Sequence, residues 1–217
     1  MPKSPAYVID FDSTLIVRES LDDLAELALR DDPERELICA ELQTLTTRGM
    51  TGELPFDASL TGRLALFNAS IGNISSLNDA LAAHLSPSAV RHSDWFKENA
   101  ERVYVVSGGF EEIIKPTVER LGILATNVYA NGFLIDEHGN ICGHDTSRLT
   151  AQAGGKAAQV RELCLNRPII AIGDGSTDLE IRLRGEADEF WAFTETVTRP
   201  GVIKHADRVL TSFLDLA

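Results

Sequence analysis

Three short apolar runs, each followed by a polar or glycine-rich loop, constrain the fold of this chain more than any other feature. They lie at residues 7–9, 103–106 and 169–172, and none has the polar alternation of a half-exposed strand. Continuous apolar runs of this length are typical of parallel strands covered on both faces. Helical periodicity follows at residues 111–121 and precedes the third run at 156–165. The alternation predicts an α/β fold with a parallel sheet.

Residues 16 to about 90 have a different pattern, in which apolar residues recur at helical spacing. One helix is expected to begin near Ser20, and a second is expected to carry Pro33 in its first turn, a position that suits proline. Two more helices are expected over residues 56–67 and 75–85. The segment therefore predicts a helical bundle inserted after the first strand.

The remainder of the chain returns to the alternation of strands and helices. Shorter strands are expected at residues 127–130, 190–193 and 208–210, and a hairpin turn is expected at residues 137–140. We therefore expect a discontinuous α/β core, residues 1–15 and 92–217, and a helical-bundle cap domain, residues 16–91.

The charge balance excludes one large class of partners. The 217 residues include 20 Lys and Arg against 33 Asp and Glu, a formal net charge of −13. Such a chain lacks the positive field that a nucleic-acid backbone requires, so nucleic acid is not an expected partner. There is no apolar run of roughly 20 residues and no signal-peptide pattern, so we expect no membrane span and a cytoplasmic location. Three widely spaced cysteines, Cys39, Cys142 and Cys164, indicate reduced thiols rather than disulfides or a zinc cluster.

Two carboxylates follow the first strand. Asp10 and Asp12 are two residues apart, so an extended chain places their side chains on one side, roughly 7 Å apart. Neighbouring carboxylates repel and titrate differently, which suits one to act as nucleophile or metal ligand and the other as general acid. The alternative, a pair of turn-forming aspartates, stays open at this point.

Glycines accompany two further candidate groups. Ser107-Gly108-Gly109 offers a hydroxyl and backbone N–H groups at the expected start of a helix, which is a natural phosphate cradle. Gly154-Gly155-Lys156 places a lysine at another expected helix start, from which its ammonium can reach a phosphate. A tight turn and a solvated surface lysine are the respective alternatives.

The third strand leads into Gly173-Asp174-Gly175-Ser176-Thr177-Asp178, which adds two carboxylates. Carboxylates from separate loops suit Mg²⁺, and in open parallel sheets ligands bind beyond the carboxyl ends of the strands. One pocket can therefore gather all three loops, although an ordinary Asp-Gly turn is the alternative. In the helical segment, Phe56 and Arg63 share a face, where the arginine can clamp a small carboxylate or simply be exposed.

In chain order, four motifs resemble those of the haloacid dehalogenase superfamily of phosphohydrolases: Asp-Phe-Asp-Ser-Thr, Ser-Gly-Gly-Phe, Gly-Gly-Lys and Gly-Asp-Gly-x-x-Asp. Within it the chain is most similar to the phosphoserine phosphatase family, over most of its length. The resemblance implies a Rossmann-like parallel core with a helical cap. Two positions depart from the pattern, because Thr177 stands where many members have Asn, and residues 86–100 lack a frequent Pro-Gly pair.

The resemblance also implies roles for individual residues. Asp10 would form an aspartyl-phosphate, and Asp12 would protonate the leaving oxygen and then activate water. Mg²⁺ would be held by Asp10, the Asp12 backbone carbonyl and Asp174, supported by Asp178. Glu19 would meet a substrate ammonium and Arg63 a carboxylate. Further substrate contacts are implied for Met50, Phe56, Ser107, Gly108, Lys156 and Thr177.

The leading hypothesis is Mg²⁺-dependent hydrolysis of O-phosphoserine, the last step of serine biosynthesis, by a monomer or homodimer. A second hypothesis keeps the aspartyl-phosphate but acts on another small phosphate ester, or transfers the phosphoryl group to an alcohol such as homoserine. A third is a receiver-like signalling module, against which Asp12 and the helical insertion argue.

Overall fold

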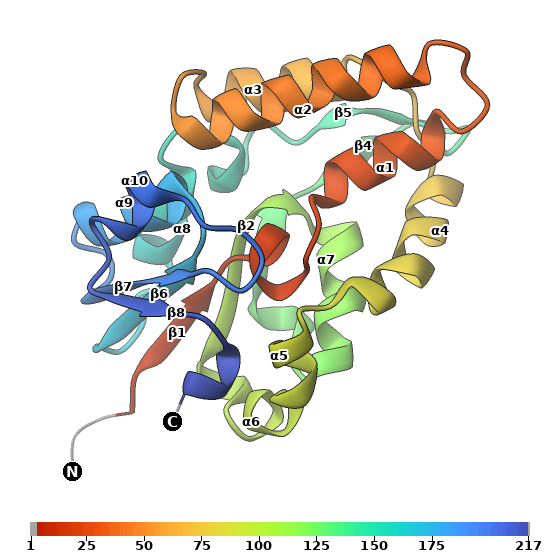
Figure 1. Ribbon diagram of the computed structural model, residues 1–217. Coiled ribbons are helices and arrows are strands. Elements are labelled where there is room, and N and C mark those ends of the chain that lie inside the picture. The colour runs from red at the N-terminus through yellow and green to blue at the C-terminus, as the bar shows by residue number, and fades with distance from the viewer. Residues whose placement is uncertain (1–3, 217) are drawn as a thin grey trace.

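The computed structural model describes residues 4–216, and its centre is a six-stranded parallel sheet (Figure 1). In spatial order the strands are β3 (Val128–Asn131), β2 (Val103–Phe110), β1 (Ala6–Ile9), β6 (Ile169–Gly173), β7 (Glu189–Phe193) and β8 (Arg208–Leu210). Central β1 pairs with β2 on one side and β6 on the other, which places Ile9 beside Val105 and Ile172. The strand order reverses here, at the position where open parallel sheets bind ligands. The expected α/β fold is confirmed.

Apolar residues cover both faces of the sheet because successive side chains of a strand point to opposite faces. Val8 and Ala171 pack in a cluster with residues of α8 (Gly155–Glu162) and α9 (Ser176–Leu183). Ile9 and Ile172 belong to a larger cluster with residues of α7 (Glu111–Val118), and this cluster continues into the helical segment through Leu24. The remaining core helix is α10 (Pro200–Ile203). The core and the helical segment therefore share one apolar interior.

The inserted segment is helical as expected, and its longer helices lie over the sheet edge at which the strands end (Figure 1). Its helices are α1 (Ser20–Ala28), α2 (Arg35–Thr51), α3 (Phe56–Leu64) and α4 (Ile71–Leu81), followed by α5 (Pro87–Arg91) and α6 (Ser93–Glu98). We call α1 to α4 the cap. No helix within residues 4–216 is long and apolar enough to cross a membrane.

A hairpin from the second half of the chain adds to the cap side. Strands β4 (Phe133–Ile135) and β5 (Ile141–His144) pair antiparallel, which confirms the predicted hairpin. Its turn is tied to the chain ahead of α4, because Ile71 N donates to Gly139 O at 2.9 Å and Ile141 N donates to Ala69 O at 2.8 Å. The cap side of the molecule therefore includes residues of the β4–β5 hairpin, which lies outside the inserted segment in the sequence.

Two neighbouring connections join the cap to the core. Val17 N donates to the carbonyl of His84 at 2.9 Å, and Ser86 N donates to the carbonyl of Leu15 at 2.8 Å. The outgoing and returning chains thus form a short antiparallel pair around Ile16. This pair holds the two connections between core and cap side by side.

Several boundaries differ from the sequence-based expectations. Pro33 precedes α2 instead of lying in its first turn, and α4 begins at Ile71, where the Ser70 side chain forms a capping box with Asn73. β2 continues through Phe110, so Ser107, Gly108 and Gly109 lie in the end of a strand and not at a helix start. The proposed cradle is therefore built on extended backbone.

Candidate active site

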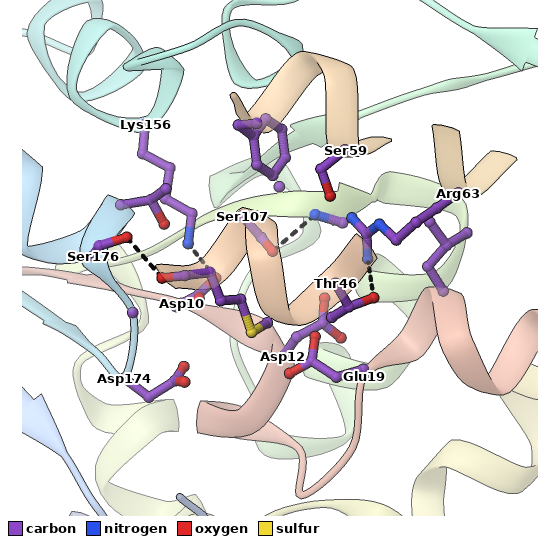
Figure 2. Close-up of a pocket in the computed structure, with 18 residues that line it drawn as sticks. Asp10, Asp12, Glu19, Thr46, Ser59, Arg63, Ser107, Lys156, Asp174 and Ser176 are labelled. Carbon is purple, nitrogen blue, oxygen red and sulfur yellow. Dashed lines mark hydrogen bonds and ion pairs between the residues drawn. The ribbon is translucent and has the colours of Figure 1, made fainter. Parts of the chain in front are cut away.

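A cavity lies between the carboxyl ends of the strands and the cap, and it gathers the predicted site residues from both (Figure 2). Every residue predicted for the site, except Asp178, lines this cavity: Asp10, Asp12, Glu19, Met50, Phe56, Arg63, Ser107, Gly108, Lys156, Asp174 and Thr177. Asp178 is buried immediately behind Lys156, to which it is bonded. The structure thus brings together residues separated by up to most of the chain length.

Lys156 joins two carboxylates at the floor of the cavity. Its Nζ lies 2.8 Å from Asp10 Oδ1 and 2.7 Å from Asp178 Oδ1, and all three side chains are buried. Burial by itself lowers the pKa of Lys156, but the charges of Asp10 and Asp178 outweigh it and raise that pKa above its ordinary value. Lys156 therefore remains a cation beside Asp10.

Asp12 occupies a different environment from Asp10. Asp10 and Asp12 both have extended backbone angles, and residues Phe11–Leu15 form a tight turn in which Ser13 has a left-handed φ of 55°. Asp12 Oδ1 accepts a hydrogen bond from Ser20 N at 2.7 Å, at the start of α1. Loss of solvation and the nearby charge of Asp10 raise the pKa of Asp12 to about 7. A carboxyl that exchanges its proton near neutrality suits general acid–base catalysis.

Three buried carboxylates form the candidate metal site. Asp10, Asp174 and Asp178 each offer an oxygen within 4.8 Å of the others. Asp174 also lies 3.4 Å from Thr14 Oγ1 and 2.8 Å from Arg199 Nε, whereas Asp178 Oδ2 accepts from Gly175 N at 3.0 Å. Hard oxygen donors of this kind are those that Mg²⁺ prefers. The donor set therefore fits the predicted ion, with Asp178 already engaged by Lys156.

Burial raises the pKa of Asp174, and it raises the pKa of Asp178 to about 7. Negative charge from Asp10 adds to both shifts. Gly173 permits this crowding, because a Cβ there would lie 2.3 Å from the Asp178 carboxyl. A cation would reduce the mutual repulsion of these acidic groups.

The end of β2 forms one wall of the cavity. Gly109 N donates to Ser107 Oγ at 3.1 Å, and Asn131 Nδ2 donates to the carbonyl of Gly108 at 2.8 Å. A Cβ at position 108 would lie 2.5 Å from the ring of Phe56. The glycine therefore allows the cap residue Phe56 to cover this strand end directly.

The cap supplies the opposite wall. Glu19, at the start of α1, accepts a hydrogen bond from Ser13 Oγ at 2.6 Å. Burial and the charge of Asp12 raise the pKa of Glu19 well above its ordinary value. Phe56 and Arg63 of α3 both line the cavity, so the predicted shared face is confirmed. In Figure 2 Arg63 approaches from the side of Thr46, while Lys156 points at Asp10 from the other side.

Two contacts between core and cap were missing from the sequence-based prediction. Arg199 Nη2 lies 3.0 Å from Met50 Sδ, while its Nε binds Asp174. Ser176 Oγ donates to the backbone carbonyl of Met50 at 3.0 Å, in the last turn of α2. The only sequence signal for Arg199 is its place in the loop after the short strand at 190–193, which ends at the same sheet edge as the three loops considered.

Comparison with known proteins gives the same assignment as the motifs. A model of haloacid dehalogenase-like hydrolases matches residues 7–181. The chain is 35% identical over 214 residues to phosphoserine phosphatases of Arabidopsis thaliana, a chloroplastic protein, and of Homo sapiens. The alignments cover 97% of this chain, and 70% and 91% of those proteins respectively.

Solved structures extend the likeness to the whole fold. A phosphoserine phosphohydrolase-like protein from Francisella tularensis superposes with a TM-score of 0.88 at 27% identity, over 98% of both chains. A substrate-bound phosphoserine phosphatase complex superposes with a TM-score of 0.78 at 22% identity, over 99% of this chain and 97% of that one. The chain therefore belongs to the haloacid dehalogenase-like hydrolase family, among the relatives of the phosphoserine phosphatases.

Proposed function

We propose that this protein is an Mg²⁺-dependent phosphoserine phosphatase that works through an aspartyl-phosphate. The observation that carries the proposal is one cavity with two different ends. One end holds Asp10 beside the Lys156 ammonium, and the other holds Glu19 and Arg63. A substrate with a phosphate at one end and an amino-acid group at the other matches this distribution of charges, and the relatives named above support the same choice.

The chemistry follows from the different environments of Asp10 and Asp12. The Asp10 carboxylate attacks phosphorus, and the P–O bond to the seryl oxygen breaks as Asp12 delivers a proton to that oxygen. Asp12, now ionised, accepts a proton from water, which attacks the aspartyl-phosphate and releases inorganic phosphate. The raised pKa of Asp12, about 7, allows it to serve in both directions.

The surrounding groups hold the phosphoryl oxygens during both steps. Lys156, the Ser107 hydroxyl and the backbone N–H of Gly108 are the proposed donors, with Thr177 in the first turn of α9 beside them. All four residues line the cavity. Phe56 covers that end and keeps bulk water away from the reacting atoms.

Mg²⁺ is proposed to bind Asp10, Asp174 and the backbone carbonyl of Asp12. The buried cluster of Asp10, Asp174 and Asp178 supports this choice, because its carboxyls have no compensating cation except Lys156 and Arg199 among the described residues. When bound, the ion supplies positive charge between the Asp10 carboxylate and the phosphate dianion, which otherwise repel.

At the opposite end, Glu19 is proposed to bind the substrate ammonium and Arg63 the carboxylate. Burial raises the pKa of Glu19, and an ammonium beside it would favour its ionised form. Met50 of α2 and Phe56 of α3 also line the cavity from the cap. The cap would thus select substrates by both their charge and their length.

The test is phosphate release from a panel of small phosphate esters with Mg²⁺. We expect phosphoserine to be the best substrate, chelator to abolish turnover, and added Mg²⁺ to restore it. Asp10→Asn should lower kcat at least about a thousandfold, whereas the exposed control Asp94→Asn should match the native protein. Strong preference for another ester, or transfer to homoserine without phosphate release, would refute the proposal.

A further inference from the structure

We propose that Asp22 and Thr46 position Arg63 to recognise a substrate carboxylate, and so determine which phosphate esters the cavity accepts. The three residues come from three different helices of the cap, α1, α2 and α3. The inference rests on the proposed function for the identity of the substrate. It adds two residues that act through Arg63 and not on the phosphoryl group.

Arg63 is a buried cation with unfilled hydrogen-bonding capacity. Its relative exposure is 8%, and its Nε has no hydrogen-bond partner within residues 4–216. A guanidinium carries five N–H donors, and leaving them unpaired away from water is unfavourable. The Nε–H and the Nη2 group beside it form an edge that matches the two oxygens of a carboxylate. Because Arg63 lines the cavity, that ligand would come from the substrate.

Thr46 fixes the other edge of the guanidinium. Arg63 Nη1 donates to Thr46 Oγ1 at 3.3 Å. The Thr46 hydroxyl is in turn 3.0 Å from Asp22 Oδ1 and 3.0 Å from the carbonyl of Leu42, so its proton has an acceptor in either direction. A β-branched side chain on a helix has few rotamers, and Thr46 is itself buried. The hydroxyl therefore presents its lone pair to Arg63 in one orientation.

Asp22 compensates the charge of Arg63 without occupying its free edge. Asp22 Oδ1 lies 3.8 Å from Arg63 Nη1, which is an ion-pair distance and too long for a hydrogen bond. A bidentate Asp22 would compete with the substrate, whereas a missing Asp22 would leave the buried cation unbalanced. The arrangement keeps the guanidinium oriented and leaves its Nε edge open to one more anion.

The experiment compares pairs of esters that differ in the carboxylate. Steady-state KM and kcat are measured for phosphoserine and O-phosphoethanolamine, and for 3-phosphoglycerate and glycerol 3-phosphate. Thr46→Val removes the hydroxyl and keeps the shape, and Asp22→Asn removes the charge. Each variant should raise KM about tenfold for the carboxylate-bearing ester of a pair and leave its partner within about twofold. kcat should change little, because the phosphoryl end of the cavity is untouched.

Matched controls separate positioning from cap stability. Thr44 makes the same backbone contact as Thr46, to Ala40 O at 2.9 Å, but is exposed, so Thr44→Val should behave as native protein. Asp23, next to Asp22, pairs with Arg18, and Asp23→Asn should not change the preference within either pair of esters. Thr46→Ser should restore most of the preference, because it restores the hydroxyl.

Three results with the variants would overturn the inference. They are equal losses on both esters of a pair, preferences no different from those of the controls, and no recovery in Thr46→Ser. A native protein that discriminates neither pair would overturn it as well. A native protein that prefers 3-phosphoglycerate to phosphoserine would refute the proposed function alone, and the second pair would still decide the role of Asp22 and Thr46.

Discussion

Removing the charge of Lys156 should destabilise the protein strongly as well as inactivate it. Lys156→Met keeps the length of the side chain but leaves Asp10 and Asp178 buried without the cation that lies 2.8 and 2.7 Å from them. Breaking a buried ion pair from one side costs about 3–5 kcal/mol of the free energy of unfolding. For a protein of this size, each kcal/mol shifts Tm by about 2–4 °C, so the expected loss is about 6–20 °C.

The loss should depend on pH in a defined direction. The raised pKa of Lys156 means that its stabilising charge is fully present at every pH below that of an unfolded lysine, about 10.4. In the variant, the pKa of Asp178, already about 7, should rise further, so the folded state binds a proton that the unfolded state releases near pH 4. Protonation of Asp178 therefore stabilises the folded variant at pH 5, and this stabilisation is lost as the pH rises to 8.

Thermal unfolding of both proteins at pH 5 and pH 8, in chelator, measures this effect. The difference in Tm should be larger at pH 8 than at pH 5. Lys97→Met is the control, because Lys97 is exposed and pairs with the exposed Asp94 at 3.1 Å, a contact worth less than about 1 kcal/mol. The reasoning is refuted if Lys156→Met unfolds within 2 °C of the native protein at pH 8, or if the difference in Tm shrinks at higher pH. Either result would mean that the ion pairs of Lys156 with Asp10 and Asp178 do not stabilise the fold.

Two further substitutions test how the cap closes on the core. Gly108→Ala places a Cβ 2.5 Å from the Phe56 ring, so kcat/KM for phosphoserine should fall about tenfold or more. The double variant with Phe56→Leu should recover part of this loss, and unchanged steady-state kinetics in Gly108→Ala would contradict the close approach. Ser176→Ala removes the hydrogen bond to the Met50 carbonyl, so KM for phosphoserine should rise about fivefold, while Tm in differential scanning calorimetry should change by less than about 3 °C. An unchanged KM would show that this bond does not hold the cap against the core.

The parts of the site that lie on strand ends were predictable from the sequence. The loops after β1, β2 and β6 end at one edge because parallel strands share a direction, so Asp10, Ser107 and Asp174 had to meet if the sheet formed. Lys156 was predictable because a helix that follows a glycine pair packs beside that edge. In each case a local sequence pattern indicated where the residue lies on its element, and the sheet topology brought the elements together.

The contacts that the sequence did not reveal are side-chain contacts between elements far apart in the chain. The bond from Ser176 to Met50 spans 126 residues, and the bond from Arg199 to Met50 spans 149. Neither depends on a recurring local pattern, because serine and arginine occur in many loops without such partners. Thr46 was hidden for a similar reason, since a threonine on a helix face gives no sign of the arginine above it.

The acidity of the chain has its main consequence inside the cavity and not at the surface. Within the described structure the cavity and its floor hold five acidic groups against three cationic side chains: Asp10, Asp12, Glu19, Asp174 and Asp178, against Arg63, Lys156 and Arg199. Four of these carboxyls have raised pKa values, because burial and the negative charge of their neighbours both disfavour the ionised forms. A divalent cation and a substrate ammonium relieve that repulsion, and a phosphate and a carboxylate then meet Lys156 and Arg63. The net charge of −13 is therefore compatible with an anionic substrate, provided that cations enter the site with it.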